Sequence, residues 1–183
     1  MSTDDAAARE ALRARQGAGA RYDADAAPHD DLLLARRGTA YFARKLNELS
    51  DAELWGDSLR PGQTRRHVIA EVSYQAREIA IALSALNGPL AAEEAEWRPD
   101  VALATTLPAR ALRHLFEHSA KHLDVEWRDL PGAKWDAAVT LLDGTQPMAR
   151  ATPRQRAAAI WQAAVDLGNG ARASDIPVIL RQP

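Results

Sequence analysis

The chain has 183 residues, with 23 Lys and Arg against 25 Asp and Glu, which gives a formal net charge of −2 with neutral histidines. This near-balance excludes the strongly basic surface expected of a protein that binds nucleic acid or anionic lipid. Cysteine is absent, which excludes disulfides, cysteine nucleophiles and thiolate metal sites. The length favours one domain, and an alanine-rich composition with 5% aromatic residues favours helices over sheets.

The first 30 residues are polar and alanine-rich, with few branched apolar side chains to bury. We expect residues 1–30 to form a mobile leader that contains a short helix at about residues 6–15. The segment lacks the apolar run of a signal peptide, and no other stretch approaches the roughly 20 apolar residues of a membrane span. We therefore expect a soluble cytoplasmic protein, monomeric or homodimeric, with neither nucleic acid nor membrane as a partner.

Four segments carry apolar residues at the three- and four-residue spacing of an amphipathic helix. The predicted helices cover, in chain order, residues 31–49, 64–86, 108–131 and 152–167. Thr64 suits the N-cap of the second helix, and Pro108 suits the first turn of the third. Glycine-containing segments at residues 87–89 and 168–170 end the second and fourth helices.

Residues 138–148 predict a small β-hairpin. A run of strand-forming residues enters the turn dipeptide Asp143-Gly144, and Pro147 limits the second strand. Four amphipathic helices with short to moderate connections favour an all-α fold. The sequence therefore predicts an up-down four-helix bundle over residues 31–183, with the hairpin between helices three and four.

The second predicted helix carries a polar stripe, His67, Glu71, Tyr74 and Glu78, at spacings of four, three and four residues. A histidine and a glutamate four residues apart can share a hydrogen bond, bind a metal together, or hold the carboxylate as a general base. The alternative is a solvated helix edge with a weak surface pair. The spacing by itself leaves both interpretations open.

The third predicted helix carries His114, His118 and His122 at four-residue intervals. Each neighbouring pair can chelate one divalent ion, but the outer two lie about 12 Å apart along the helix axis. One ion therefore cannot take all three. Flanking Arg113 and Lys121 favour a polar outer face instead of a metal site.

The fourth predicted helix is dominated by alanine around Trp161 and Gln162. One interpretation is close helix packing against small residues. The other is an emptied space, since alanines four residues apart, such as Ala159 and Ala163, leave room for a ligand. The ring of Trp161 then offers that ligand a stacking surface.

Several segments resemble mycothiol-dependent maleylpyruvate isomerase. They include LARRGT at residues 34–39, SLRPG at 58–62, TR at 64–65, HVIA at 67–70, EHS at 117–119, LDV at 123–125, WR at 127–128, IW at 160–161 and AVDLG at 164–168. The resemblance covers about residues 31–181 and depends on the order and spacing of these segments. It implies the DinB-like four-helix metal-binding domain that forms the N-terminal part of that family.

The resemblance also implies a site. In that family a divalent metal, usually zinc, binds one histidine on helix two and a glutamate and a histidine on helix four, and the thiol cofactor serves to isomerise maleylpyruvate to fumarylpyruvate. By position, these ligands fall on Glu71, Ala159 and Ala163. Gln63 replaces a tryptophan that is common after the loop glycine. The family's C-terminal domain is expected to be absent, since the sequence ends at Pro183.

Loss of all three implied ligands predicts a chain without a metal or other cofactor, because alanine supplies no ligand and a catalytic zinc needs three. The space left by the metal predicts a pocket for a planar small molecule. Glu71, assisted by His67, is the expected general base for proton abstraction, since removal from water strengthens a carboxylate base.

The other expected site residues bind the substrate. Trp161 would stack on it, Gln63 and Gln162 would donate hydrogen bonds to a developing oxyanion, and Tyr74, Ala159 and Ala163 would complete the pocket. Three alternatives stay open: a thiol-dependent isomerase or S-transferase of the family, a non-catalytic small-molecule-binding module, and an inactivated variant. The sequence itself does not distinguish a natural chain from an engineered one.

Overall fold

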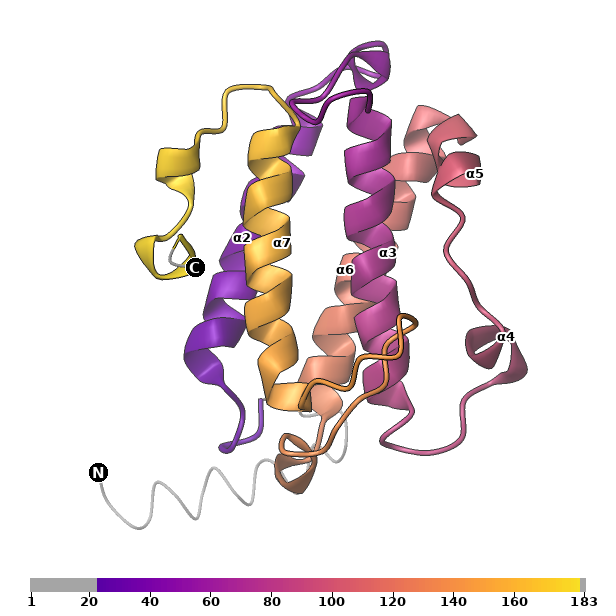
Figure 1. The fold of residues 1–183 in the computed structure, drawn as a ribbon, viewed down its shortest axis with the longest axis vertical. Coiled ribbons are helices and arrows are strands. Elements are labelled where there is room, and N and C mark those ends of the chain that lie inside the picture. The colour runs from indigo at the N-terminus through magenta and orange to yellow at the C-terminus, as the bar shows by residue number, and fades with distance from the viewer. Residues whose placement is uncertain (1–22, 182–183) are drawn as a thin grey trace, which may run out of the picture.

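The computed structural model describes residues 23–181 and consists of four long helices with irregular connections. The long helices are α2 (His29–Asn47), α3 (Arg65–Ser84), α6 (Ala109–Asp129) and α7 (Thr152–Asp166). In Figure 1, α7 and α3 stand side by side in front, with α2 and α6 behind them. The main contacts join α2 to α7 and α3 to α6, and α3 also meets α7. The predicted all-α, DinB-like bundle is confirmed, and the four predicted helices match within about two residues.

The direction of the helices differs from the predicted up-down order, because α3 and α6 run the same way. Arg66, in the first turn of α3, donates to the carbonyls of Thr105 and Leu107, just before α6 begins. Beyond the other ends of both helices, Lys134 donates to the carbonyl of Leu86 at 2.7 Å. For α6 to run in the same direction as α3, the chain must return along the whole length of α3, which is about 30 Å for a 20-residue helix. The connection from residue 85 to residue 108 is long enough to do so.

That connection contains two short helices, α4 (Ala92–Ala95) and α5 (Val101–Thr106), which the periodicity does not reveal. Asp100 caps α5 by accepting a hydrogen bond from the Leu103 amide at 2.9 Å. Single 3-10 turns occupy Glu53–Trp55, Gly132–Lys134, Ala149–Ala151, Ala173–Asp175 and Val178–Leu180.

The predicted hairpin forms only as a closed loop, so this detail of the prediction is wrong. In residues 138–148 a single antiparallel bridge pairs Ala138 with Met148, and this segment contains no strand. Gly144 adopts a φ of +82°, as expected of the Asp143-Gly144 turn. Pro147 has no amide hydrogen to donate and so limits the ladder, while the carboxylate of Glu78 accepts a hydrogen bond from the Leu142 amide at 2.7 Å.

The bundle begins earlier than the predicted boundary at residue 31. Asp23 forms an ion pair with Arg36 at 2.6 Å, and Ala27 is buried before α2 starts at His29. Residues 29 and 30 therefore belong to α2, and the segment just before them is tied to that helix through Asp23 instead of belonging to a leader. The rest of the predicted leader, including its expected short helix, lies outside the described residues.

The core contains aliphatic and aromatic side chains from all four long helices. Phe42 of α2 contacts Phe116 of α6, with 4.8 Å between ring centroids. The buried indole of Trp127 donates to the hydroxyl of Thr152 at 3.0 Å and ties α6 to α7. Within residues 23–181, no helix has both the length and the apolar character needed to cross a membrane.

Candidate functional site

Arg60 connects α3 to α7 at the end of the bundle where α3 begins. Its Nη1 donates to the carboxylate of Glu71 on α3, and its Nε donates to Oδ2 of Asp166 on α7 at 2.6 Å. Burial disfavours the charged guanidinium, but hydrogen bonds and attraction from Asp166 and Glu71 outweigh burial and raise the pKa of Arg60. The result is a fixed positive charge between two carboxylates.

The loop between α2 and α3 holds Arg60 in this place. The Leu59 amide donates to the Asp166 carbonyl at 2.8 Å, and the Ser58 hydroxyl donates to the Gln63 carbonyl at 2.8 Å. Gly62 takes a φ of +73°, a left-handed conformation that glycine adopts without strain. These bonds fasten the loop to the last turn of α7, so Arg60 is directed across the interface of α3 and α7.

The two glutamines expected to bind an oxyanion instead serve these carboxylates. Gln63 Nε2 lies 3.4 Å from Glu71 Oε1, and Gln162 Nε2 donates to Asp166 Oδ1 at 2.8 Å. We call Arg60, Glu71 and Asp166, with Gln63 and Gln162, the Arg60 network. The structure brings the two glutamines to the predicted neighbourhood, but as partners of protein carboxylates.

Glu71 does not occupy the apolar environment expected for a general base. Its side chain is 37% exposed and is paired with Arg60. Ala163 is buried and Ala159 is half-buried. None of three well-formed clefts on residues 23–181 is lined by Glu71, Ala159 or Ala163. The desolvation on which the predicted base depended is therefore missing.

His67 contributes to the start of α3. Its Nδ1 lies 3.3 Å from the Thr64 amide nitrogen and 3.0 Å from the Thr64 hydroxyl oxygen. A side chain at the third helical position that bonds back to the N-cap residue is a capping arrangement. Among the described residues, no hydrogen bond joins His67 to Glu71, so the expected assistance between the two is not formed.

Trp161 faces α2 instead of the space beside Glu71. Its indole donates to the Leu34 carbonyl at 3.0 Å, and its ring stacks on Tyr41 with 5.0 Å between centroids. A Cβ atom on Gly38 of α2 would lie 2.7 Å from the indole Cδ1, so this glycine permits the close packing. Residues 161 and 163 lie about 200° apart around a helix, so Trp161 and Ala163 face different neighbours. The stacking platform predicted beside Ala163 is therefore not part of that space.

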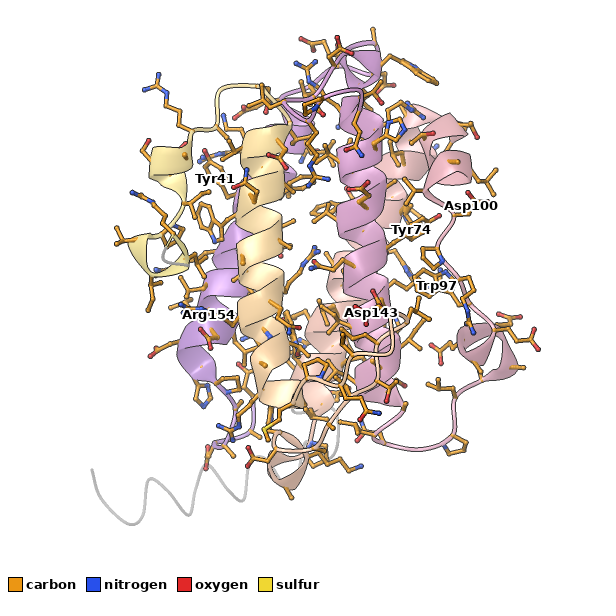
Figure 2. The ribbon with its side chains drawn as sticks, in the orientation of Figure 1. Tyr41, Tyr74, Trp97, Asp100, Asp143 and Arg154 are labelled. Atoms are coloured by element: carbon orange, nitrogen blue, oxygen red, sulfur yellow. The ribbon has the colours of Figure 1, made fainter. Side chains whose placement is uncertain are left out.

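Tyr74 points away both from Trp161 and from the space beside Glu71 and Ala163. Its ring meets Trp97 edge to face at 5.6 Å, and its hydroxyl lies 3.4 Å from the Asp100 carbonyl. Figure 2 shows Tyr74 beside Trp97 and Asp100 on one side of the front helices, and Tyr41 on the other side. The predicted binding residues Trp161 and Tyr74 therefore do not converge on one ligand.

The residues at the implied metal positions do not fit zinc. Ala159 and Ala163 offer no donor atoms, and the carboxylate of Glu71 is engaged by Arg60. Within residues 23–181, no three His, Cys, Asp or Glu side chains gather closely enough to hold a metal ion.

The three histidines of α6 follow one another along the helix, with ring centroids 6.0 and 6.4 Å apart. His122 Nε2 lies 3.4 Å from a carboxylate oxygen of Glu126 in the next turn of α6. His114 and His118 are exposed. This arrangement agrees with the polar outer face predicted for this helix.

Residues 35–168 match the family model described as the mycothiol maleylpyruvate isomerase N-terminal domain. The chain belongs to this family. A solved structure of the mycothiol-dependent maleylpyruvate isomerase is similar to it, with 35% identity and a TM-score of 0.73. A histidine-to-alanine variant of such an isomerase is similar with 34% identity and a TM-score of 0.74.

Each of these matches covers 83% of this chain and 65% of the solved chain, so the protein spans about two thirds of the length of the isomerases it matches. A comparison with curated proteins found no match.

Two residues of the Arg60 network were not singled out as site residues from the sequence. Arg60 lies in a turn, and Asp166 lies in the last turn of α7, four residues after Gln162. A partial signal was the charge of Glu71, since a carboxylate at a helix interface is often paired with a basic side chain. The sequence does not reveal which of the 23 basic side chains supplies it.

Proposed function

We propose that this protein is a metal-independent member of its family that binds a polar small molecule at the Arg60 network. The observation that carries the proposal is the guanidinium of Arg60 between Glu71 and Asp166, a protein cation bonded to one of the three positions where the family resemblance implies a metal ligand. Arg60 and Glu71 are 32% and 37% exposed, so a solute can reach them. Gln162 is exposed beside them.

The thiol named in the similar isomerases, mycothiol, is the first ligand to test. Its binding would be measured by calorimetry with and without zinc, and we expect binding that does not depend on zinc. Arg60→Met should weaken that binding about tenfold or more, since a bond to a charged donor is lost. Arg150→Met is the matched control, because Arg150 pairs with Asp136 near the opposite end of α7. Equal effects of the two substitutions would contradict the proposal.

Zinc affinity tests the metal-independent part of the proposal. One carboxylate engaged by Arg60 should bind zinc no more tightly than about the millimolar range. A variant combining Glu71→His, Ala159→Glu, Ala163→His and Arg60→Leu should gain one tight zinc site. Tight zinc binding by the unaltered chain at a stoichiometry of one would overturn the proposal.

Glu71→Gln separates binding from catalysis by a carboxylate base. If the site only binds, this substitution should change ligand affinity modestly, because the amide retains an acceptor for Arg60. A base would instead lose several kcal/mol of transition-state stabilisation in that variant, which is a loss of more than about a hundredfold in turnover. Retained affinity with no turnover in either form supports the binding role.

A further inference from the structure

Arg156 of α7 is buried in the centre of the bundle and has no carboxylate partner among residues 23–181. Its side chain is 1% exposed. Nη1 donates to the Val72 carbonyl at 2.6 Å and to Gln75 Oε1 at 2.9 Å, both on α3. Nη2 is buried and has no acceptor within the described part of the chain. One side of the guanidinium is therefore satisfied by neutral groups and the other side is free to bond.

A lone buried cation destabilises a folded protein unless a negative charge or enough acceptors offset it. Burial lowers the pKa of Arg156 to about 9, so the guanidinium still carries its charge at pH 7. Departures of this kind from favourable packing concentrate at functional sites. The unsatisfied Nη2 makes Arg156 a candidate donor for an acceptor from outside the protein.

Arg156 lines a cleft of about 280 Å³ between α2 and α6, on the side of the bundle opposite the interface of α3 and α7. The α2 wall includes Ala40 and Ala43, and the α6 wall includes Ala120, Leu123 and Trp127. This volume is at the lower end for ligand pockets, so it suits a small molecule. Thr39 and the charged residues Arg36 and Asp124 also line the cleft, and the rest of the walls is apolar, which suits a ligand with an apolar body.

The other charged groups of the cleft already have partners. Arg36 donates to Asp23 and to Asp124, with shortest distances of 2.6 and 2.8 Å. Asp124 also lies 3.5 Å from Arg128. These contacts leave Arg156 as the cation with bonding capacity to spare. A nearby aspartate and a single available guanidinium favour a singly charged anion over phosphate.

We infer that the cleft between α2 and α6 binds a small monocarboxylic acid, with its carboxylate on Arg156 and its apolar body between the alanine-lined walls. This site is separate from the Arg60 network, which lies across the bundle. The inference therefore does not depend on the proposed function.

Calorimetry with sodium benzoate and with neutral benzamide, at pH 7 and equal ionic strength, tests the site in the full chain. The ring is the same in both probes, so a difference in affinity reports the carboxylate. We expect one benzoate per chain and a preference over benzamide of about tenfold or more. Equal affinities, or no benzoate binding, would overturn the inference.

Three variants identify the residues responsible. Arg156→Met should abolish the preference for benzoate, and Ala43→Leu should weaken both probes by filling the cleft while Arg156 stays in place. If Arg156→Met fails to fold, Ala43→Leu tests the site by itself, because unchanged benzoate affinity in Ala43→Leu would mean that benzoate binds outside this cleft.

Arg60→Leu is the control variant and should leave benzoate affinity unchanged. A failure of the benzoate inference is therefore distinguishable from a failure of the proposed function at Arg60. Inorganic phosphate binding as tightly as benzoate would also overturn the assigned ligand class.

Discussion

Arg60 and Arg156 place positive charge at two depths of the same bundle, with opposite consequences. Arg60 is about one third exposed and lies between two carboxylates, which raise its pKa. Arg156 is almost fully buried and contacts a carbonyl and an amide, and burial lowers its pKa. The first arginine has two carboxylate partners and is reached by solvent, whereas the second is closed off from solvent and has a buried donor without an acceptor among residues 23–181.

Replacing Arg156 should give the largest effect and test whether its charge or its volume matters. Arg156→Ala should reduce the free energy of unfolding by about 3 kcal/mol, because it leaves a cavity and removes donors to Val72 and Gln75. Arg156→Met should cost less than about 1 kcal/mol, since it fills the space and removes an uncompensated charge. Urea unfolding measures both. Equal losses in the two variants would mean that the guanidinium of Arg156 itself stabilises the fold, which would contradict its description as an uncompensated buried charge.

Replacing Arg60 should give an intermediate effect. Arg60→Met leaves Glu71 and Asp166 without their cation, and partial exposure to water limits the expected loss to about 1–2 kcal/mol at pH 7. Arg150→Met removes an ion pair whose aspartate is 70% exposed and should change stability by less than about 0.5 kcal/mol. Urea unfolding of the two variants compares them directly. A smaller loss for Arg60→Met than for Arg150→Met would contradict the central role given to Arg60.

Replacing Arg36, at the cleft lined by Arg156, should give a smaller effect than replacing Arg60, with a defined pH dependence. The hydrogen bond from Arg36, with smaller contributions from nearby positive charges, outweighs burial and holds the pKa of Asp23 below 3.8, its ordinary value. A carboxyl whose pKa is lowered by folding stabilises the protein above the unfolded pKa and loses that contribution as pH falls through the folded pKa. Arg36→Gln should therefore cost about 0.5–1 kcal/mol at pH 7, discounted for the partial exposure of Arg36.

Urea unfolding of the original chain and of Arg36→Gln at pH 7 and at pH 2.5 checks this dependence. The difference between the two proteins should shrink at the lower pH, where Asp23 takes up a proton. A difference that stays constant across this range would assign the effect to packing and not to the ion pair.

The sequence predicted the four long helices because apolar side chains spaced three and four residues apart lie on one face of a helix. Thr64 and Pro108 precede α3 and α6 as expected, and the Asp143-Gly144 turn also forms. The same patterns carry no information about direction, so the parallel arrangement of α3 and α6 was not predicted. That arrangement depends on the length of the connection and on long-range contacts such as those of Arg66.

The candidate site was predicted in part. Glu71, Gln63 and Gln162 lie in one neighbourhood, but the two glutamines contact protein carboxylates and not a substrate, whereas Trp161 and Tyr74 each pack against other elements. A large aromatic residue beside alanines is compatible with either helix neighbour, and Gly38, 123 positions earlier in the chain, allows α2 to approach it. Such a choice between neighbours cannot be read from one helix.

The sequence by itself determined an all-α bundle and its family resemblance, and the replacement of metal ligands at Glu71, Ala159 and Ala163 stays a prediction from that resemblance. The tertiary structure decided which charges meet. Arg60 and Asp166 are 106 positions apart, and Arg156 lies 81 positions from Gln75. Pairing over such separations depends on how whole helices pack. The charge of one arginine is therefore balanced by two carboxylates, and another arginine is charged in the core without a carboxylate partner among residues 23–181, although the sequence shows both simply as basic residues.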